Sequence, residues 1–123
     1  MKESAWRSKL VQKFKEHNSH GFIWAHDAHF KTGFPDLTTI VDGTPKWIEL
    51  KRIRNIRCDP LKELKPTQRE TLNKMDVANR GRCFVLARAD DTGEICCVNT
   101  LTKLATTWPG EVFHRENWWY LIG

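Results

Sequence analysis

The 123-residue sequence lacks any long hydrophobic run. A transmembrane helix needs roughly 20 consecutive apolar residues, and no stretch of this chain approaches that length. The first six residues, MKESAW, have no apolar run after their charges, so they do not resemble a secretory signal. Internal repeats and low-complexity segments are absent too. We therefore expect one domain over residues 1–123, no membrane partner, and a cytoplasmic location in a prokaryotic or phage-infected host cell.

The spacing of the cysteines does not suit a metal. The four cysteines are Cys58, Cys83, Cys96 and Cys97, and no two of them form the CxxC pair that is typical of zinc sites. Cys96 and Cys97 are adjacent, so in a strand their side chains would point to opposite faces. We expect ordinary reduced thiols.

Basic residues outnumber acidic ones, 20 to 15, which gives a formal net charge of +5. An excess of this size favours an anionic partner such as a nucleic acid, because each phosphate contact releases condensed counterions. Charge alone fits any basic soluble domain equally well. Its placement adds information, since several basic residues crowd one part of the chain: Lys51, Arg52, Arg54, Arg57, Lys62 and Lys65.

Hydrophobic periodicity and turn residues predict a mixed α/β domain. Asp42 and Gly43 form a strong hairpin dipeptide, and Thr67 with Glu70 suggests a capping box at the start of a second helix. The aromatic-rich extension at about residues 108–123 is expected to pack on the sheet as a lid. The predicted elements are a helix (3–18), a strand (22–25), a loop (26–34), a hairpin (37–41 and 47–53), a mobile loop (55–65), a helix (66 to about 81) and two strands (82–89 and 94–99).

The hairpin carries the residues that could take part in catalysis. In a strand over residues 47–53, Glu49 and Lys51 share one face, whereas Ile48 and Leu50 point into the opposite, apolar layer. The turn folds this strand back onto the strand that begins after Asp36. Two carboxylates and one ammonium group can then converge at one end of a β-ribbon.

Such a group of charges suits a divalent cation. Two carboxylates a few ångströms apart repel each other, and a bound cation relieves that repulsion. Magnesium accepts one or two carboxylates, a backbone carbonyl, waters and phosphate oxygens, and Leu50 offers the natural carbonyl. The metal would activate a water, and Lys51 would position that water or neutralise the transition state. The alternative is structural: Asp36 as a turn residue, and Glu49 with Lys51 as an exposed ion pair.

These residues resemble a known motif. Pro35 and Asp36, followed thirteen residues later by Glu49-Leu50-Lys51, resemble the PD-(D/E)xK motif of restriction-endonuclease-like nucleases. Together the segments GFPDL (33–37), WIELK (47–51) and KPTQ (65–68) are similar to the VRR-NUC group, the virus-type replication-repair nucleases. The resemblance covers residues 3 to 90. It implies a restriction-endonuclease-like fold, a mixed central sheet flanked by helices in the order α-β-β-β-α-β.

The resemblance also implies roles for individual residues. Asp36 and Glu49 would be metal ligands together with the Leu50 carbonyl, and Lys51 would be the catalytic lysine. Gln68 would lie beside the site and orient a water or touch phosphate; the alternative is a polar residue facing solvent.

A further catalytic glutamate is implied on the first helix, where Glu3 fits better than Glu16 because it starts the helix. His26 is expected to be an exposed loop residue. Contacts to the DNA backbone are expected from four basic residues: Lys31, Arg52, Arg54 and Arg57.

The expected activity is hydrolysis of phosphodiester bonds in DNA with Mg²⁺, for which Mn²⁺ can substitute, leaving a 5′-phosphate and a 3′-hydroxyl. Because nothing in the sequence resembles a sequence-reading module, we expect a structure-selective endonuclease that acts on branched or flapped DNA. A homodimer would let two sites act on two strands, with the aromatic tail as its interface. Two alternatives remain: a non-catalytic DNA-binding protein of the same fold, and a protein-interaction module that uses the Trp-rich tail.

Overall fold

Five strands, in chain order, form the sheet at the centre of this α/β fold. The computed structural model describes residues 3–26, 34–55, 57–78 and 82–99. Strands β3 and β4 run parallel, and the other neighbouring pairs are antiparallel. A parallel pair needs a crossover connection, which α2 supplies. The elements are α1 (Glu3–His17), β1 (Phe22–Ala25), β2 (Leu37–Val41), β3 (Thr44–Ile53), α2 (Pro66–Ala78), β4 (Cys83–Ala89) and β5 (Ile95–Asn99).

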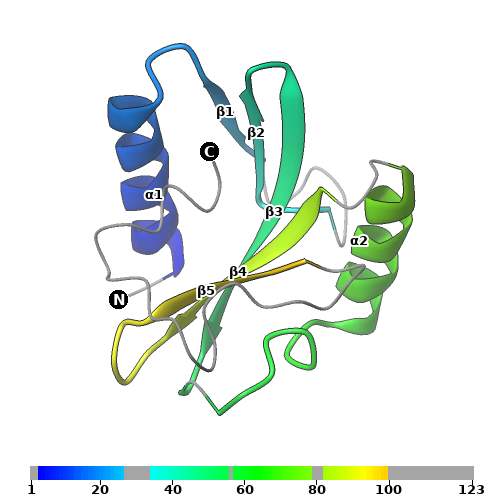
Figure 1. The fold of residues 1–123 in the computed structure, drawn as a ribbon. Coiled ribbons are helices and arrows are strands. Elements are labelled where there is room, and N and C mark those ends of the chain that lie inside the picture. The colour runs from blue at the N-terminus through cyan, green and yellow to red at the C-terminus, as the bar shows by residue number, and fades with distance from the viewer. Residues whose placement is uncertain (1–2, 27–33, 56, 79–81, 100–123) are drawn as a thin grey trace.

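The two helices lie on either side of the sheet (Figure 1). On α1, Trp6, Leu10 and Phe14 recur every four residues and are buried against Ile48 and Leu50 of β3. The opposite layer joins Leu72 of α2 to buried residues of β4 and of the preceding loop: Leu64, Cys83 and Val85. Consecutive residues of β3 therefore face different helices, as the sequence pattern predicts.

The turn between β2 and β3 determines the register of the hairpin. Asp42 has a φ of 51° and Gly43 a φ of 75°, so both turn residues adopt the left-handed conformation of a type I′ turn. Pairing runs from Val41 opposite Thr44 to Leu37 opposite Ile48. Strand β3 thus starts three residues earlier than its apolar pattern suggests, because the strands pair right up to the turn.

Helix α2 begins at Pro66, a position at which proline loses no helical hydrogen bond. The backbone N–H of Lys65 donates to Gln68 Oε1 at 3.0 Å, so the capping interaction falls on Lys65 and Gln68 rather than on Thr67 and Glu70. Glu70 instead pairs with Lys74, at 3.1 Å.

The described residues between β3 and α2 form turns with no helix or strand, as predicted. The segment is nevertheless packed against the fold, since Leu64 is 6% exposed and Leu61 contacts the core on the α2 side. Predictions for Lys31 and for the aromatic tail at 108–123 lie outside the described residues.

Cys96 and Cys97 point to opposite faces of the sheet, as their adjacent positions in a strand predict. Cys83, Cys96 and Cys97 are buried, and Cys96 and Cys97 belong to core clusters on opposite faces of the sheet. Burial raises the pKa of the Cys97 thiol to about 12. In the described parts of the chain, no helix is long and apolar enough to cross a membrane.

Candidate active site

Asp36 and Glu49 lie level with each other at the open end of the β2–β3 hairpin. Asp36 stands one residue before β2, and continuing the register beyond the Leu37–Ile48 pair brings it opposite Glu49. The backbone N–H of Leu50 donates to Asp36 Oδ2 at 2.9 Å. This bond holds the aspartate carboxylate against the edge of β3.

The Glu49 carboxyl group is almost completely enclosed. Glu49 is 4% exposed, and Gln68 Nε2 of α2 donates to its Oε1 at 3.4 Å. Its Oε2 is buried with no hydrogen-bond donor among the described residues when the group is ionised. A buried carboxylate oxygen without a donor is costly unless the group is protonated or a cation approaches it.

The pKa of Glu49 reflects the same unfavourable burial of its charged form. It is raised from 4.5 to about 10, first by burial, then by a hydrogen bond that the protonated group shares with Asp36, then by the negative charge of Asp36. Glu3 raises it further, and the charge of Lys51 opposes the increase. Without a cation, Glu49 therefore keeps its proton at neutral pH.

Lys51 and the carbonyl of Leu50 complete the centre of the site. Lys51 is half-buried on the same face of β3 as Glu49, and its charge acts on both Glu49 and Glu3. The N–H and C=O of one strand residue point to the same edge. Because the Leu50 N–H points to Asp36, the Leu50 carbonyl faces that edge too, beyond the end of β2.

The start of α1 brings two more charged groups. Burial raises the pKa of Glu3, with a second contribution from Asp36 and opposing ones from Lys51 and Arg7. Arg7 Nη1 lies 4.0 Å from Asp36 Oδ1. Glu16, at the other end of α1, pairs with Lys13 at 3.6 Å. Of the two candidate glutamates, Glu3 is thus the one beside the carboxylate pair.

Sequence reasoning missed Arg7. Its spacing from Glu3 was the available signal, since residues four apart share one face of a helix. An arginine on the same face as a candidate catalytic glutamate can neutralise a neighbouring carboxylate or meet a phosphate.

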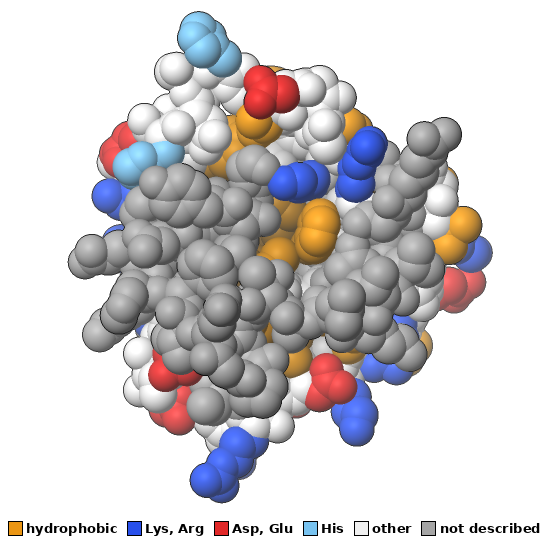
Figure 2. All heavy atoms as spheres, in the orientation of Figure 1, with side chains coloured by type: hydrophobic (Ala, Val, Ile, Leu, Met, Phe, Trp, Pro, Cys, Tyr) orange, Lys and Arg blue, Asp and Glu red, His pale blue; other side chains and the backbone are white. Residues whose placement is uncertain are grey.

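The predicted DNA-binding residues differ in their surroundings. Arg52 is engaged by Asp90, with Nε–Oδ1 at 3.0 Å and Nη2–Oδ2 at 3.2 Å. Arg54 and Arg57 are exposed after the end of β3. In Figure 2, basic and acidic side chains of the described residues are interspersed around the margin of the face shown.

His26 is not the exposed loop residue that its polar surroundings predict. Its Nε2 lies 2.6 Å from Thr38 Oγ1, and its ring meets Phe34 edge-on with centroids 4.8 Å apart. Burial lowers its pKa, against a smaller opposing effect of Asp36. The side chain thus helps to hold the chain just before Asp36 in place.

Among the residues that the structure describes, no three His, Cys, Asp or Glu side chains are grouped as a self-contained metal cage. The two facing carboxylates and the Leu50 carbonyl at the strand edge suit a cation that keeps several of its waters, as magnesium does. No model of a known protein family matches the sequence, and no curated protein matches it. The motif residues and their geometry therefore carry the functional argument.

Proposed function

We propose that the protein is a metal-dependent nuclease that hydrolyses phosphodiester bonds in DNA. One observation carries the proposal: two carboxylates, Asp36 and Glu49, face each other, and the pKa of Glu49 is raised to about 10. A structural ion pair would lower the pKa of its carboxylate. Strongly raised values arise where carboxyl groups are buried or lie beside like charges, and such values cluster at functional sites.

The donor set fits Mg²⁺ or Mn²⁺. Asp36, Glu49 and the Leu50 carbonyl all offer hard oxygen atoms, the kind that these cations prefer. Glu49 Oε2 has no donor among the described residues while ionised, so it is available to a cation. When bound, the metal would supply an activated water and charge stabilisation at phosphorus.

The surrounding residues have complementary roles. Lys51 would position the attacking water or neutralise charge on the pentavalent phosphorus, since it shares the face of Glu49. Gln68 would keep the Glu49 carboxyl group oriented, because it contacts Glu49 while also capping α2. Glu3 and Arg7 would set the charge on the α1 side of the site.

The substrate proposal rests on the motif resemblance and on charge. A restriction-endonuclease-like core, DNA as substrate, and products with a 5′-phosphate and a 3′-hydroxyl all follow from that resemblance. The net charge of +5 supports a polyanionic substrate. We favour a structure-selective endonuclease for branched or flapped DNA, acting as a homodimer so that both strands can be cut.

The test is a cleavage panel. Linear, nicked, flapped and four-way DNA would be incubated with Mg²⁺, with Mn²⁺ and with EDTA. The matched variants are Lys51→Ala and Lys9→Ala, because Lys9 is an exposed lysine of α1 outside the site. We expect cleavage with either metal, none in EDTA, loss in Lys51→Ala and retention in Lys9→Ala.

Binding that survives EDTA and is unchanged in Lys51→Ala, without any cleavage, would indicate a non-catalytic DNA-binding protein instead. Absence of salt-dependent DNA binding would favour a protein-interaction module. Light scattering at several concentrations would decide whether the chain is a dimer.

A further inference from the structure

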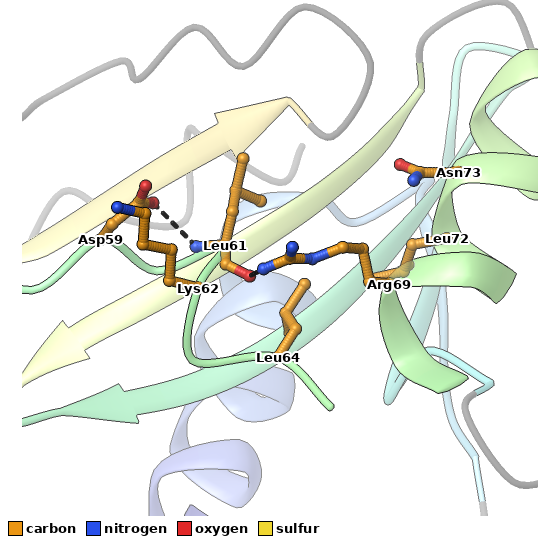
Figure 3. A pocket seen from close by; sticks show the side chains of 7 residues that line it. All are labelled: Asp59, Leu61, Lys62, Leu64, Arg69, Leu72 and Asn73. Atoms are coloured by element: carbon orange, nitrogen blue, oxygen red, sulfur yellow. Dashed lines mark hydrogen bonds between the residues drawn. The ribbon is translucent and has the colours of Figure 1, made fainter. Parts of the chain in front are cut away.

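A pocket of about 200 Å³ lies between the segment that follows β3 and the first turns of α2 (Figure 3). It does not include the carboxylate pair. Its lining comes partly from the connecting segment and partly from the helix: Asp59, Leu61, Lys62, Leu64, Arg69, Leu72 and Asn73. A second hollow adjoins it and shares four of these residues.

The lining divides by chemistry. Leu61, Leu64 and Leu72 are apolar, and the last two are buried. The remaining residues, Asp59, Lys62, Arg69 and Asn73, are exposed and polar. A ligand with a flat apolar body and an anionic group would satisfy both parts.

The polar wall is held in place by hydrogen bonds. Arg69 Nη2 donates to the carbonyl of Leu61, and Figure 3 shows its side chain reaching from α2 to the connecting segment. The N–H of Leu61 donates to Asp59 Oδ1 at 3.0 Å. A guanidinium has five N–H groups, so Arg69 keeps donors for an anion while it fixes this segment. Such preorganisation reduces the entropy lost on binding.

The pocket adjoins the carboxylate site through α2. Gln68, which contacts Glu49, and Arg69, which lines the pocket, are consecutive residues of the helix. The pocket and Glu49 also lie on the same side of the sheet, because Leu72 packs with Val85 of β4 and Val85 pairs with Glu49. A DNA strand that leaves the carboxylate site past Gln68 would reach the pocket next.

We propose that this pocket holds one unpaired nucleotide of the DNA strand being cleaved. The base would lie against the side chain of Leu61 and the exposed part of Leu64, the Asn73 amide would bond to its edge, and Lys62 and Arg69 would bind its phosphate. The Asp59 carboxylate would accept from base or sugar rather than face the phosphate. This inference rests on the proposed nuclease function and supplies a reason for a preference for flapped or branched DNA.

The experiment compares a flapped duplex with a blunt duplex of equal length by fluorescence anisotropy in EDTA. Lys62→Glu and Asn73→Asp change the pocket without removing the Arg69 anchor, and Lys9→Glu on α1 is the matched charge control. We expect each pocket variant to weaken flap binding about tenfold and blunt binding less than about threefold. In parallel, a flap base that carries a diazirine, which inserts into any nearby side chain, should crosslink to residues 59–73 of the wild-type chain.

Equal losses for flapped and blunt DNA, or a crosslink elsewhere, would overturn the proposal. So would a free deoxynucleotide monophosphate that binds as tightly as the flap, because the pocket would then serve free nucleotides. The cleavage panel separates the two claims. Selective flap binding without cleavage would support the nucleotide pocket and contradict the nuclease function. Cleavage that shows no flap preference and is unaffected by Lys62→Glu would support the nuclease function and contradict the pocket.

Discussion

Replacing Glu49 with glutamine should make the metal-free protein more stable at neutral and alkaline pH. The pKa of Glu49 is raised from 4.5 to about 10, first by burial and then by Asp36. The folded state therefore keeps a proton that the unfolded state releases. Stability is greatest below about 4.5 and falls as pH rises towards about 10. Glutamine has no charge to desolvate and lacks this loss.

The magnitude follows from the width of that pH window. Each pH unit between the two pKa values is equivalent to about 1.4 kcal/mol of stability. At pH 7 the loss from Glu49 is therefore about 3 kcal/mol relative to acid pH. Added Mg²⁺ should reduce the difference, because a metal that binds the ionised wild-type site at a hundred times its Kd contributes about 2.7 kcal/mol.

The assay is urea unfolding in EDTA at acid, neutral and alkaline pH, with Glu63→Gln as an exposed glutamate control. Wild type and Glu49→Gln should have similar stability at pH 4, with a gap that widens as pH rises. The control should show no such gap. A Glu49→Gln protein that is no more stable than wild type at pH 8 would refute the claim that this carboxyl group is desolvated beside Asp36.

Other substitutions test the remaining roles. Lys51→Ala should abolish cleavage of branched or plasmid DNA while the unfolding curve and the DNA affinity by anisotropy stay near wild type; wild-type turnover would remove Lys51 from the mechanism. Asp36→Asn should weaken both Mg²⁺ binding and turnover, and equal Mg²⁺ affinity by calorimetric titration would contradict its role as a ligand. Gln68→Ala should lower the free energy of unfolding by about 1 kcal/mol through loss of the cap and also reduce turnover. A loss of stability alone would limit Gln68 to capping α2.

The hairpin shows how much of the site follows from local sequence. Asp42 and Gly43 suit a type I′ turn, and a two-residue turn at that position leaves one register, in which Asp36 comes opposite Glu49. Alternation along β3 then separates Glu49 and Lys51 from Ile48 and Leu50. Short-range rules sufficed here, because every constraint lies within fifteen residues.

Contacts between distant elements were harder to predict. The approach of α1 to Asp36 depends on how the helix packs on the sheet, which no local pattern specifies, so Arg7 was missed. The cap of α2 was placed two residues late because Lys65 is an unusual N-cap. Its side chain cannot accept from the helix N–H groups, and the observed cap is instead the Lys65 N–H donating to the Gln68 side chain. The engagement of Arg52 by Asp90 joins residues far apart in the chain.

The packing of the connecting segment after β3 was not predicted, for a related reason. Its charges and Pro60 suggested a mobile loop, yet Leu61 and Leu64 pack against the core, and Arg69 binds the segment from α2. Isolated leucines in a polar segment give no periodic signal, so their burial becomes evident only from the tertiary structure. The pocket beside α2 likewise becomes evident only from the tertiary structure, because it is formed where this segment packs against the helix.

The most direct measurement is anomalous X-ray scattering from a crystal soaked in Mn²⁺. We expect a manganese peak between the carboxylates of Asp36 and Glu49, on the side of the Leu50 carbonyl, and loss of that peak in Asp36→Asn. A saturated crystal with no density there, or with its manganese bound elsewhere, would contradict the idea that these two side chains share a catalytic cation.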